Sequence, residues 1–231
     1  MITTSHLFMS MYYFFMYSFL GWLMESTLNT LKQKTFINRG FLLGPYCPIY
    51  GIGMGIIYLI CSTLGTHPLL VFISGTFFAT LLEYLTGILM EKLFHAKWWD
   101  YSPFPYNLKG YICLHVSLAW GLLSTVFICY INPLIQVTTK YILLTPGPIF
   151  LIILCIIFIV DFAYSTYTAF KLASKFSALS ELQLRERLVQ TLSKYHIQLN
   201  KLSAGEKRLI KAFPTLRLSS IKTLKDKWLK K

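Results

Sequence analysis

The sequence predicts an all-α, polytopic membrane protein with five transmembrane helices and a basic helical tail. Of its 231 residues, 55% are hydrophobic and only 13% are charged, a balance that is unusual for a soluble globular domain. Five apolar stretches are long enough to cross a bilayer. The formal net charge of +13 lies mainly at the C-terminal end, since residues 171–231 carry fifteen basic and four acidic residues. A nearly neutral apolar body followed by a cationic tail is typical of a protein whose C-terminus stays in the cytoplasm.

Each apolar stretch has roughly the 20 residues that cross the hydrocarbon core of a bilayer. The spans are expected at residues 6–28, 41–64, 68–94, 110–131 and 148–170. The first stretch lacks the basic region and cleavage site of a secretory signal, since the first lysine is Lys32, and we expect it to be retained. We therefore expect a transmembrane domain over residues 1–170 and a cytoplasmic tail over residues 171–231.

Basic residues in the loops predict the orientation of the chain. With five spans, the loops after the first and third spans lie on the same side as the tail. These two loops carry Lys32, Lys34, Arg39, Lys92, Lys97 and Lys109, whereas the opposite side receives only Lys140. The positive-inside rule then places the N-terminus outside and the C-terminus inside.

The tail contains three helical patterns. Four leucines and Tyr195, between residues 188 and 202, have the four-and-three spacing of a helix seam. Ser203 and Glu206 have the spacing of a capping box, which predicts a short helix that ends before Pro214. Residues 221–229 form one apolar face on a lysine-rich helix, which suits either the anionic inner leaflet or packing against a neighbouring cytosolic helix.

Two motifs in the body recur with the same internal spacing and indicate a parallel duplication of spans one–two as spans three–four. Glu25 and Glu91 occupy matching places near the ends of the preceding spans. Chance recurrence is the alternative, because basic, glycine and aromatic residues are common at membrane interfaces. The motifs are Arg39-Gly40-Phe41 with Tyr50-Gly51, and Lys109-Gly110-Tyr111 with Trp120-Gly121.

Four acids lie within the expected spans, where a charge is costly, ~3 kcal/mol for Asp at a helix centre. Glu83 and Asp161 fall near the middle of the membrane, and Glu25 and Glu91 near its inner surface. Either these carboxylates line a polar cavity that binds a cation or carries a proton, or each pairs with a basic or hydroxyl neighbour. We favour the first role for Glu83 and Asp161 and the second for Glu25 and Glu91.

A second group of candidate residues lies at the cytoplasmic side. Pro45 and Pro48 predict that the second span is broken or delayed, and broken backbone at membrane depth is found where it is buried in protein or lines water. The aromatic loop after the third span suits either a membrane anchor or the rim of a cavity. The rim candidates are Arg39, Trp98, Trp99, Asp100, Tyr101 and Asn107.

The sequence contains no motif for a catalytic, cofactor or metal site, and we expect none. The five cysteines stand singly, without Cys-x-x-Cys or histidine at metal-ligand spacing, which argues against a disulfide framework or a zinc site. There is no Walker A loop or nucleophile elbow, so ATP, if used, must be bound by another chain. No nucleic-acid-binding motif accompanies the basic tail, and no nucleic acid partner is expected.

Several segments of the sequence resemble the CmpB-like family of ABC-transporter type IV permeases. They are residues 17–25, 38–46, 48–51, 82–87, 91–94 and 98–102, with the pattern Asn107-x-x-Gly110-x-x-Cys113. The resemblance implies a permease subunit in the bacterial cytoplasmic membrane, served by a separate ATPase. It supplies no catalytic residues, and the chain lacks the Glu-Ala-Ala-x-x-x-Gly loop by which many importer permeases engage their ATPase.

Three functions fit these observations. The favoured one is a membrane permease subunit with a polar intramembrane cavity, acting as a homo-oligomer because five spans are few to enclose a transport path. The second is a membrane-embedded enzyme that acts on a lipid or lipid-linked substrate at the cytoplasmic interface. Its acid–base candidates are Glu91, His95, Asp100 and His115, near Arg39. The third is a non-transporting scaffold that presents the basic tail.

Overall fold

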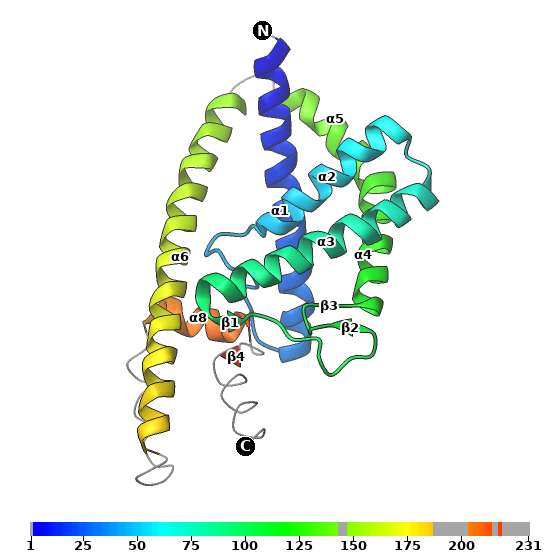
Figure 1. Cartoon of the computed structure of the whole chain (residues 1–231). Helices are drawn as coiled ribbons and strands as arrows, with labels where there is room; N and C mark the ends of the chain where they lie inside the picture. Colours follow the sequence, from blue (N-terminus) through cyan, green and yellow to red (C-terminus); the bar gives the residue numbers. More distant parts are fainter. Residues whose placement is uncertain (1, 143–146, 187–202, 214–216, 219–231) are drawn as a thin grey trace.

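The computed structural model describes residues 2–142, 147–186, 203–213 and 217–218, and this part of the chain is mostly helical (Figure 1). Within it, four helices are long and apolar enough to cross a membrane: Leu7–Gln33, Pro68–Phe94, Leu114–Thr139 and Gly147–Lys175. A further apolar helix, Pro48–Thr63, is shorter. The expected class of helical membrane protein is confirmed, whereas the count of five spans depends on the shorter helix.

The first helix pair consists of α1 (Ile2–Gln33) and α2 (Pro48–Leu64), joined by residues 34–47. Pro48 lies in the first turn of α2, a position where the missing N–H of proline is tolerated. The second span was expected to begin at residue 41, which is wrong, because the helix begins at Pro48. The expected delay of this helix at Pro45 and Pro48 is confirmed. The 17 residues of α2 extend for ~26 Å.

The second helix pair consists of α3 (Pro68–Phe94) and α4 (Leu114–Val126). Between them lie β1 (Ala96–Lys97) and a hairpin of β2 (Asn107–Leu108) and β3 (Ile112–Cys113). The fourth span was expected to begin at residue 110. Because the hairpin occupies residues 107–113, the helix begins at Leu114 instead.

The fourth span also continues beyond its expected end at residue 131. A π-helical turn (η1, Phe127–Ile131) connects α4 to α5 (Asn132–Ile142). Pro133 has no N–H to continue the regular α-helical hydrogen bonds, which accounts for the irregular turn before it. The buried Asn132 side chain accepts a 2.6 Å hydrogen bond from Tyr17 OH of α1, and this bond holds the bend against the first helix pair.

Helix α6 (Gly147–Glu186) continues without a break past residue 170, so the expected border between membrane domain and tail is not a helix end. Helix α8 (Ala204–Ala212) begins with the expected capping box of Ser203 and Glu206 and ends before Pro214. Strand β4 (Arg217–Leu218) pairs with β1. The expected leucine seam at 188–202 and the amphipathic segment at 221–229 lie outside the described residues.

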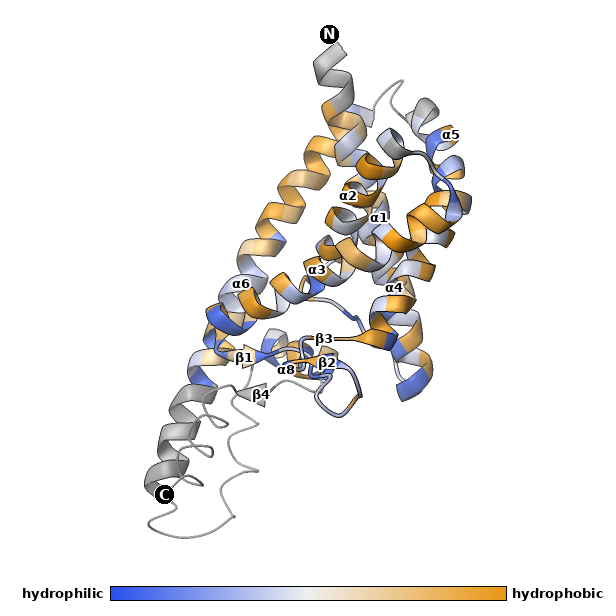
Figure 2. Cartoon of the chain, turned by 45° about the vertical axis from the view of Figure 1, so that its right-hand side comes forward, coloured by the Kyte–Doolittle hydropathy of each residue, from blue (hydrophilic) through white to orange (hydrophobic). Residues whose placement is uncertain are grey.

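Two apolar cores join the helices. The larger core contains Tyr17 of α1 and Leu151 of α6, together with buried residues of α2, α3, η1 and α5. The smaller core joins the end of α3 to α6 and α8, around Phe94 and Leu209. Figure 2 shows hydrophobic residues along the long helices and hydrophilic residues gathered near α8 and the β-strands, far from the start of α1. The basic loops after α1 and α3 lie at this same end (Figure 1).

Candidate functional site

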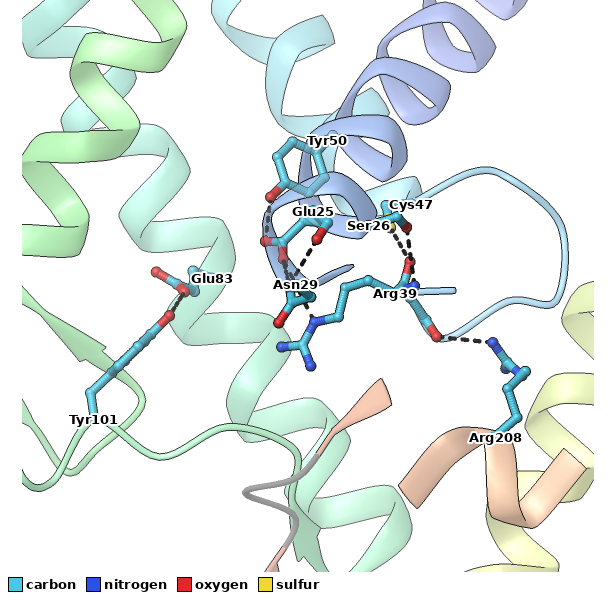
Figure 3. Close-up of polar contacts among 10 residues, drawn as sticks. Glu25, Ser26, Asn29, Arg39, Cys47, Tyr50, Glu83, Tyr101 and Arg208 are labelled. Atoms are coloured by element: carbon cyan, nitrogen blue, oxygen red, sulfur yellow. Dashed lines mark hydrogen bonds and ion pairs between the residues drawn. The ribbon is translucent and has the colours of Figure 1, made fainter. Parts of the chain in front are cut away.

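Glu83 of α3 is the centre of the candidate site, and its side chain is buried at 6% exposure. Tyr101 OH, from the loop after α3, donates to Glu83 Oε1 at 3.0 Å, as Figure 3 shows. Trp120 Nε1, from α4, donates to Glu83 Oε2 at 2.9 Å. No lysine or arginine in the described part of the chain forms an ion pair with Glu83. The carboxylate is therefore held by two uncharged donors.

Tyr101 is a firm donor to this carboxylate. Burial, followed by the negative charge of Glu83, raises the pKa of Tyr101 well above its usual value. The phenol therefore keeps its proton at any physiological pH. Among the rim candidates, Tyr101 is the residue whose hydroxyl contacts Glu83.

Glu25 of α1 has a different set of partners (Figure 3). Tyr50 OH, from α2, donates to Glu25 Oε1 at 2.8 Å, and Asn29 Nδ2 donates to Oε2 at 3.3 Å. Arg39 Nε lies 3.6 Å from Glu25 Oε2. The expected pairing of Glu25 with Arg39 is present, so its negative charge has a positive partner within the chain.

The two acids are connected by their aromatic donors. The rings of Tyr50 and Trp120 contact each other edge to face, with centroids 5.4 Å apart. Beside them lies a cavity of about 40 Å³, lined by Tyr50, Glu83, Trp120 and apolar residues of α2, α3 and α4. This volume has room for a few water molecules. The site thus lies where the two helix pairs meet.

In each helix pair a glycine of the second helix packs closely on the first helix, and the residues in contact are separated by a constant number of positions. A Cβ on Gly51 of α2 would collide with Ser18 and Phe14 of α1, and a Cβ on Gly121 of α4 would collide with Thr76 and Phe72 of α3. The α3 residues follow the α1 residues by 58 positions in both contacts, and Gly121 follows Gly51 by 70.

This register also relates the acids and their donors. Glu83 follows Glu25 by 58 positions, and Trp120 follows Tyr50 by 70. Glu25 therefore corresponds to Glu83, and not to Glu91 as the motif comparison suggests. The sequence analysis missed Tyr50 and Trp120 as donors. The signal was present, because both motifs place an aromatic residue with a polar hydrogen directly before the packing glycine.

The carboxylate of Asp161, on α6, accepts four hydrogen bonds. It accepts from the backbone N–H groups of Leu43 and Gly44 at 2.9 and 2.7 Å, and from Tyr46 OH and Ser165 Oγ at 3.0 Å each. These donors fix residues 43–46, the irregular segment before α2, against α6. The geometry gives Asp161 an anchoring contact that is separate from Glu83.

Most of the other rim candidates stabilise the loop after α3. Asp100 Oδ1 accepts from Ser102 Oγ at 2.6 Å, and Asn107 Oδ1 accepts from the Gly110 N–H at 3.1 Å. Trp99 Nε1 donates to the Tyr111 carbonyl oxygen, while Trp98 is buried in the smaller core.

The acid–base candidates of the enzyme hypothesis have separate partners. Glu91 Oε2 accepts from Tyr111 OH at 2.6 Å; burial and this contact raise the pKa of Tyr111 to about 12. His115 Nδ1 lies 3.5 Å from Cys113 Sγ. His95 ends α3 in a left-handed conformation. Within the described residues, no three His, Cys, Asp or Glu side chains are grouped as metal ligands.

The tail helix α8 docks on the loop after α1 through Arg208, which the sequence analysis did not single out. Its guanidinium donates to three successive carbonyl oxygens, those of Gly40, Phe41 and Leu42, at 3.3, 2.7 and 2.8 Å. Figure 3 shows one of these bonds. Arg39 lies over the Phe213 ring, 4.6 Å from its centroid. The residues around Glu25 are thus held in place by the tail.

Comparisons with known proteins place the chain in a family. Neither the curated proteins nor the solved structures contain a match to it. A family model described as "Putative ABC-transporter type IV" matches residues 12–166, which include both helix pairs and Asp161. Because this match covers more than half of the 231 residues, the chain belongs to the CmpB family of ABC-transporter type IV proteins.

Proposed function

We propose that this chain is a multi-pass permease subunit of an ABC-type transporter in the bacterial cytoplasmic membrane. Its transport path runs between the two helix pairs, beside Glu83. Family membership supports the transporter class, and the four long apolar helices support the membrane location. The site rests on one observation: Glu83 is buried, and its described partners are uncharged donors.

Glu83 is the group that binds a cation or carries a proton on this path. An isolated carboxylate in a low-dielectric setting gains most from a positive partner or from a proton. Glu25 already has Arg39. The neighbouring cavity of about 40 Å³ offers room for an ion or water beside Glu83. The polar path widens when the helix pairs move relative to one another.

The orientation follows from the placement of the basic loops. We infer that α2 crosses the bilayer with the four longer helices, which gives five spans with the N-terminus outside and the tail inside. The loops after α1 and α3 and helix α8 lie at one end (Figure 1), as the positive-inside rule requires of a cytoplasmic face. A separate ATPase binds at this end, and the path is completed by a second copy of the chain.

We also infer that the two helix pairs are parallel duplicates. The constant register of the glycine contacts and of the acid–donor pairs supports this. Gly40 and Gly110, which differ by the same 70 positions, both have positive φ, 140° and 75°. In this proposal Asp161 is an anchor for the loop before α2 and not a transport residue.

The first test identifies the partner. The tagged full-length chain is crosslinked in its native membrane, purified gently, and analysed by mass spectrometry. A nucleotide-binding ATPase in stoichiometric amount is the expected result. Recovery of the chain alone, with or without a tightly bound lipid, would contradict an ATP-driven permease and favour the enzyme or an ion-driven carrier.

A further inference from the structure

An apolar groove lies on the outer surface of the second helix pair. It has a volume of about 570 Å³ and is lined by Ile73, Phe77 and Leu81 of α3, by Leu108 and Ile112 of the hairpin, and by neighbouring residues. Phe77 is 61% exposed and Ile73 is 57% exposed. In a membrane-spanning helix, such side chains face the acyl chains of the bilayer.

Part of the corresponding surface of the first helix pair, at Phe14 and Phe15, is covered by α6. With the shift of 58 positions, Phe72 and Ile73 correspond to Phe14 and Phe15. The Phe158 ring of α6 packs edge to face on both of these phenylalanines, with centroids 5.6 and 5.7 Å away. The first pair therefore carries a protein cover at these two residues, whereas Phe19 and Leu23, which correspond to Phe77 and Leu81, are exposed.

The hairpin explains why the second pair does not need such a cover. In the first pair, Asp161 of α6 accepts from the N–H of Gly44. With the shift of 70 positions, the matching group is the N–H of Leu114. That N–H already donates to the Tyr106 carbonyl oxygen at 3.2 Å. The N–H of Leu114 therefore needs no carboxylate from another helix.

The cytoplasmic end of the groove is positively charged. Tyr84, which lines the groove, contacts the Tyr111 ring at 5.7 Å between centroids. Lys97 Nζ lies 4.4 Å above the same ring and donates to the Lys109 carbonyl oxygen at 2.6 Å. Lys109 itself is exposed, next to Leu108 of the groove. The Lys97 ammonium thus lies at the Tyr111 end of the groove, with Lys109 next to Leu108 in the sequence, while the nearby acid, Glu91, accepts from Tyr111 OH.

We propose that this groove is a binding site for an anionic phospholipid. One acyl chain lies along α3 against Ile73, Phe77 and Leu81, and the phosphate contacts Lys97 and Lys109. An apolar groove that ends in lysines matches a molecule with an apolar chain and an anionic head. A zwitterionic lipid has the same chain but gains less from the lysines.

Native mass spectrometry of the full-length protein tests this site. The protein is released from nanodiscs that contain equal amounts of phosphatidylglycerol and phosphatidylcholine, and the retained lipids are counted. Wild type is expected to retain one phosphatidylglycerol per chain in preference to phosphatidylcholine. Lys109→Glu should reduce this preference about fivefold, since one basic residue near an anionic surface has an effect of this size. Thr80→Trp, which fills the groove, should reduce retention of both lipids.

Two control variants separate the groove from the general surface. Lys34→Glu changes an exposed lysine beyond α1 on the same side, and Leu59→Trp adds bulk to an exposed position of α2. Both should retain phosphatidylglycerol as wild type does. Equal loss in Lys34→Glu and Lys109→Glu would overturn the proposal. So would unchanged lipid retention in both Lys109→Glu and Thr80→Trp. A change of oligomeric mass in Thr80→Trp without a change in lipid would assign the groove to a helix of a second copy.

Discussion

The two helix pairs share one packing scheme but treat their buried acids differently. In each pair an aromatic side chain donates to a glutamate, and a glycine lets the helices approach closely. Glu25 then gains Arg39 as a positive partner, whereas Glu83 gains the uncharged Tyr101. The difference shows that the same scaffold can give one acid a basic partner and the other only uncharged donors, which is the observation behind the proposed ligand site at Glu83.

The segments that connect the two helices of each pair are also held in different ways. The segment between α1 and α2 is fixed from outside by Asp161 of α6 and by Arg208 of α8. The segment between α3 and α4 has its own hairpin and the turn at Asp100. The tail contacts this segment too, through the pairing of β1 with β4 and the packing of Trp98 beside α8, but the polar anchors Asp161 and Arg208 act on the first pair.

Replacing Glu83 and Glu25 separately should give the largest difference between the two helix pairs. In a complex with the proposed ATPase, we expect Glu83→Gln to lower ATP hydrolysis at least about tenfold, or about 1.4 kcal/mol in activation free energy. Glutamine keeps the size of the side chain but cannot offer a negative charge to a cation. Glu25→Gln should have a smaller effect, because the charge it removes is already compensated by Arg39.

The amount and the elution profile of each variant serve as controls for folding in this experiment. Equal losses in the two variants would show that the charge of Glu83 has no special role. Full activity of Glu83→Gln would make its carboxylate structural and move the transport path elsewhere.

Asp161→Asn tests the contacts by which α6 holds the segment before α2. Asparagine keeps one acceptor oxygen but turns an N–H group toward the donors at Gly44 and Tyr46. Losing hydrogen bonds to a buried charged group should lower the free energy of unfolding in detergent by about 3 kcal/mol. Ser165→Ala removes a single donor to the same carboxylate and should cost about 1 kcal/mol. A smaller effect for Asp161→Asn than for Ser165→Ala would refute the anchoring role.

Replacing the packing glycines with alanine tests whether the two helix pairs have equivalent close contacts. Gly51→Ala and Gly121→Ala should each destabilise the protein by about 1–3 kcal/mol, because the added Cβ overpacks a close helix contact. Similar shifts of the thermal midpoint in detergent are expected for both. Gly55→Ala is the matched control on α2, since its Cβ would meet no atom within 4 Å. If only one of the first two variants is destabilised, the contacts are not equivalent.

The sequence was sufficient for the class of fold because hydrophobicity and length decide membrane insertion. It also located Glu83, since an acid in an apolar stretch is visible without a structure. A delay of α2 at Pro45 and Pro48 followed from proline chemistry, although the span was expected from residue 41. The hairpin at residues 107–113 did not, because Gly110 and its aromatic neighbours are equally compatible with the start of a helix.

The partners of each acid were harder to predict, because they depend on contacts between distant segments. Asp161 is hydrogen-bonded to residues more than 100 positions away, at Leu43 and Gly44. Its depth in α6 suggested function, but depth alone does not reveal how many donors surround a carboxylate. Arg208 reaches back to residue 40 in the same way. Such pairings are set by the packing of α6 and α8, which no local pattern encodes.

The smallest expected effect concerns the packing of α8 on the rest of the chain, which should depend on pH. The Glu206 side chain is fully buried and its Oε2 accepts from Lys175 Nζ at 2.8 Å. Burial opposes its ionisation, but the bonds from Lys175 and Ser203 outweigh this and hold the pKa of Glu206 below its ordinary value of 4.5. The charged form thus stabilises the docked helix above about pH 4.5, and this contribution is lost as the pH falls through the lowered pKa.

Hydrogen exchange of residues 204–212 should therefore quicken between pH 4.5 and lower pH, after correction for the intrinsic rate, while exchange in α4 stays constant. Glu206→Gln should remove this dependence, because it has no charge to lose, and should leave α8 weakly docked at neutral pH. An unchanged pH response in Glu206→Gln would assign the effect to another acid. Loss of protection in α4 together with α8 would show that the whole second helix pair depends on the tail, and the contrast between the two pairs would fail.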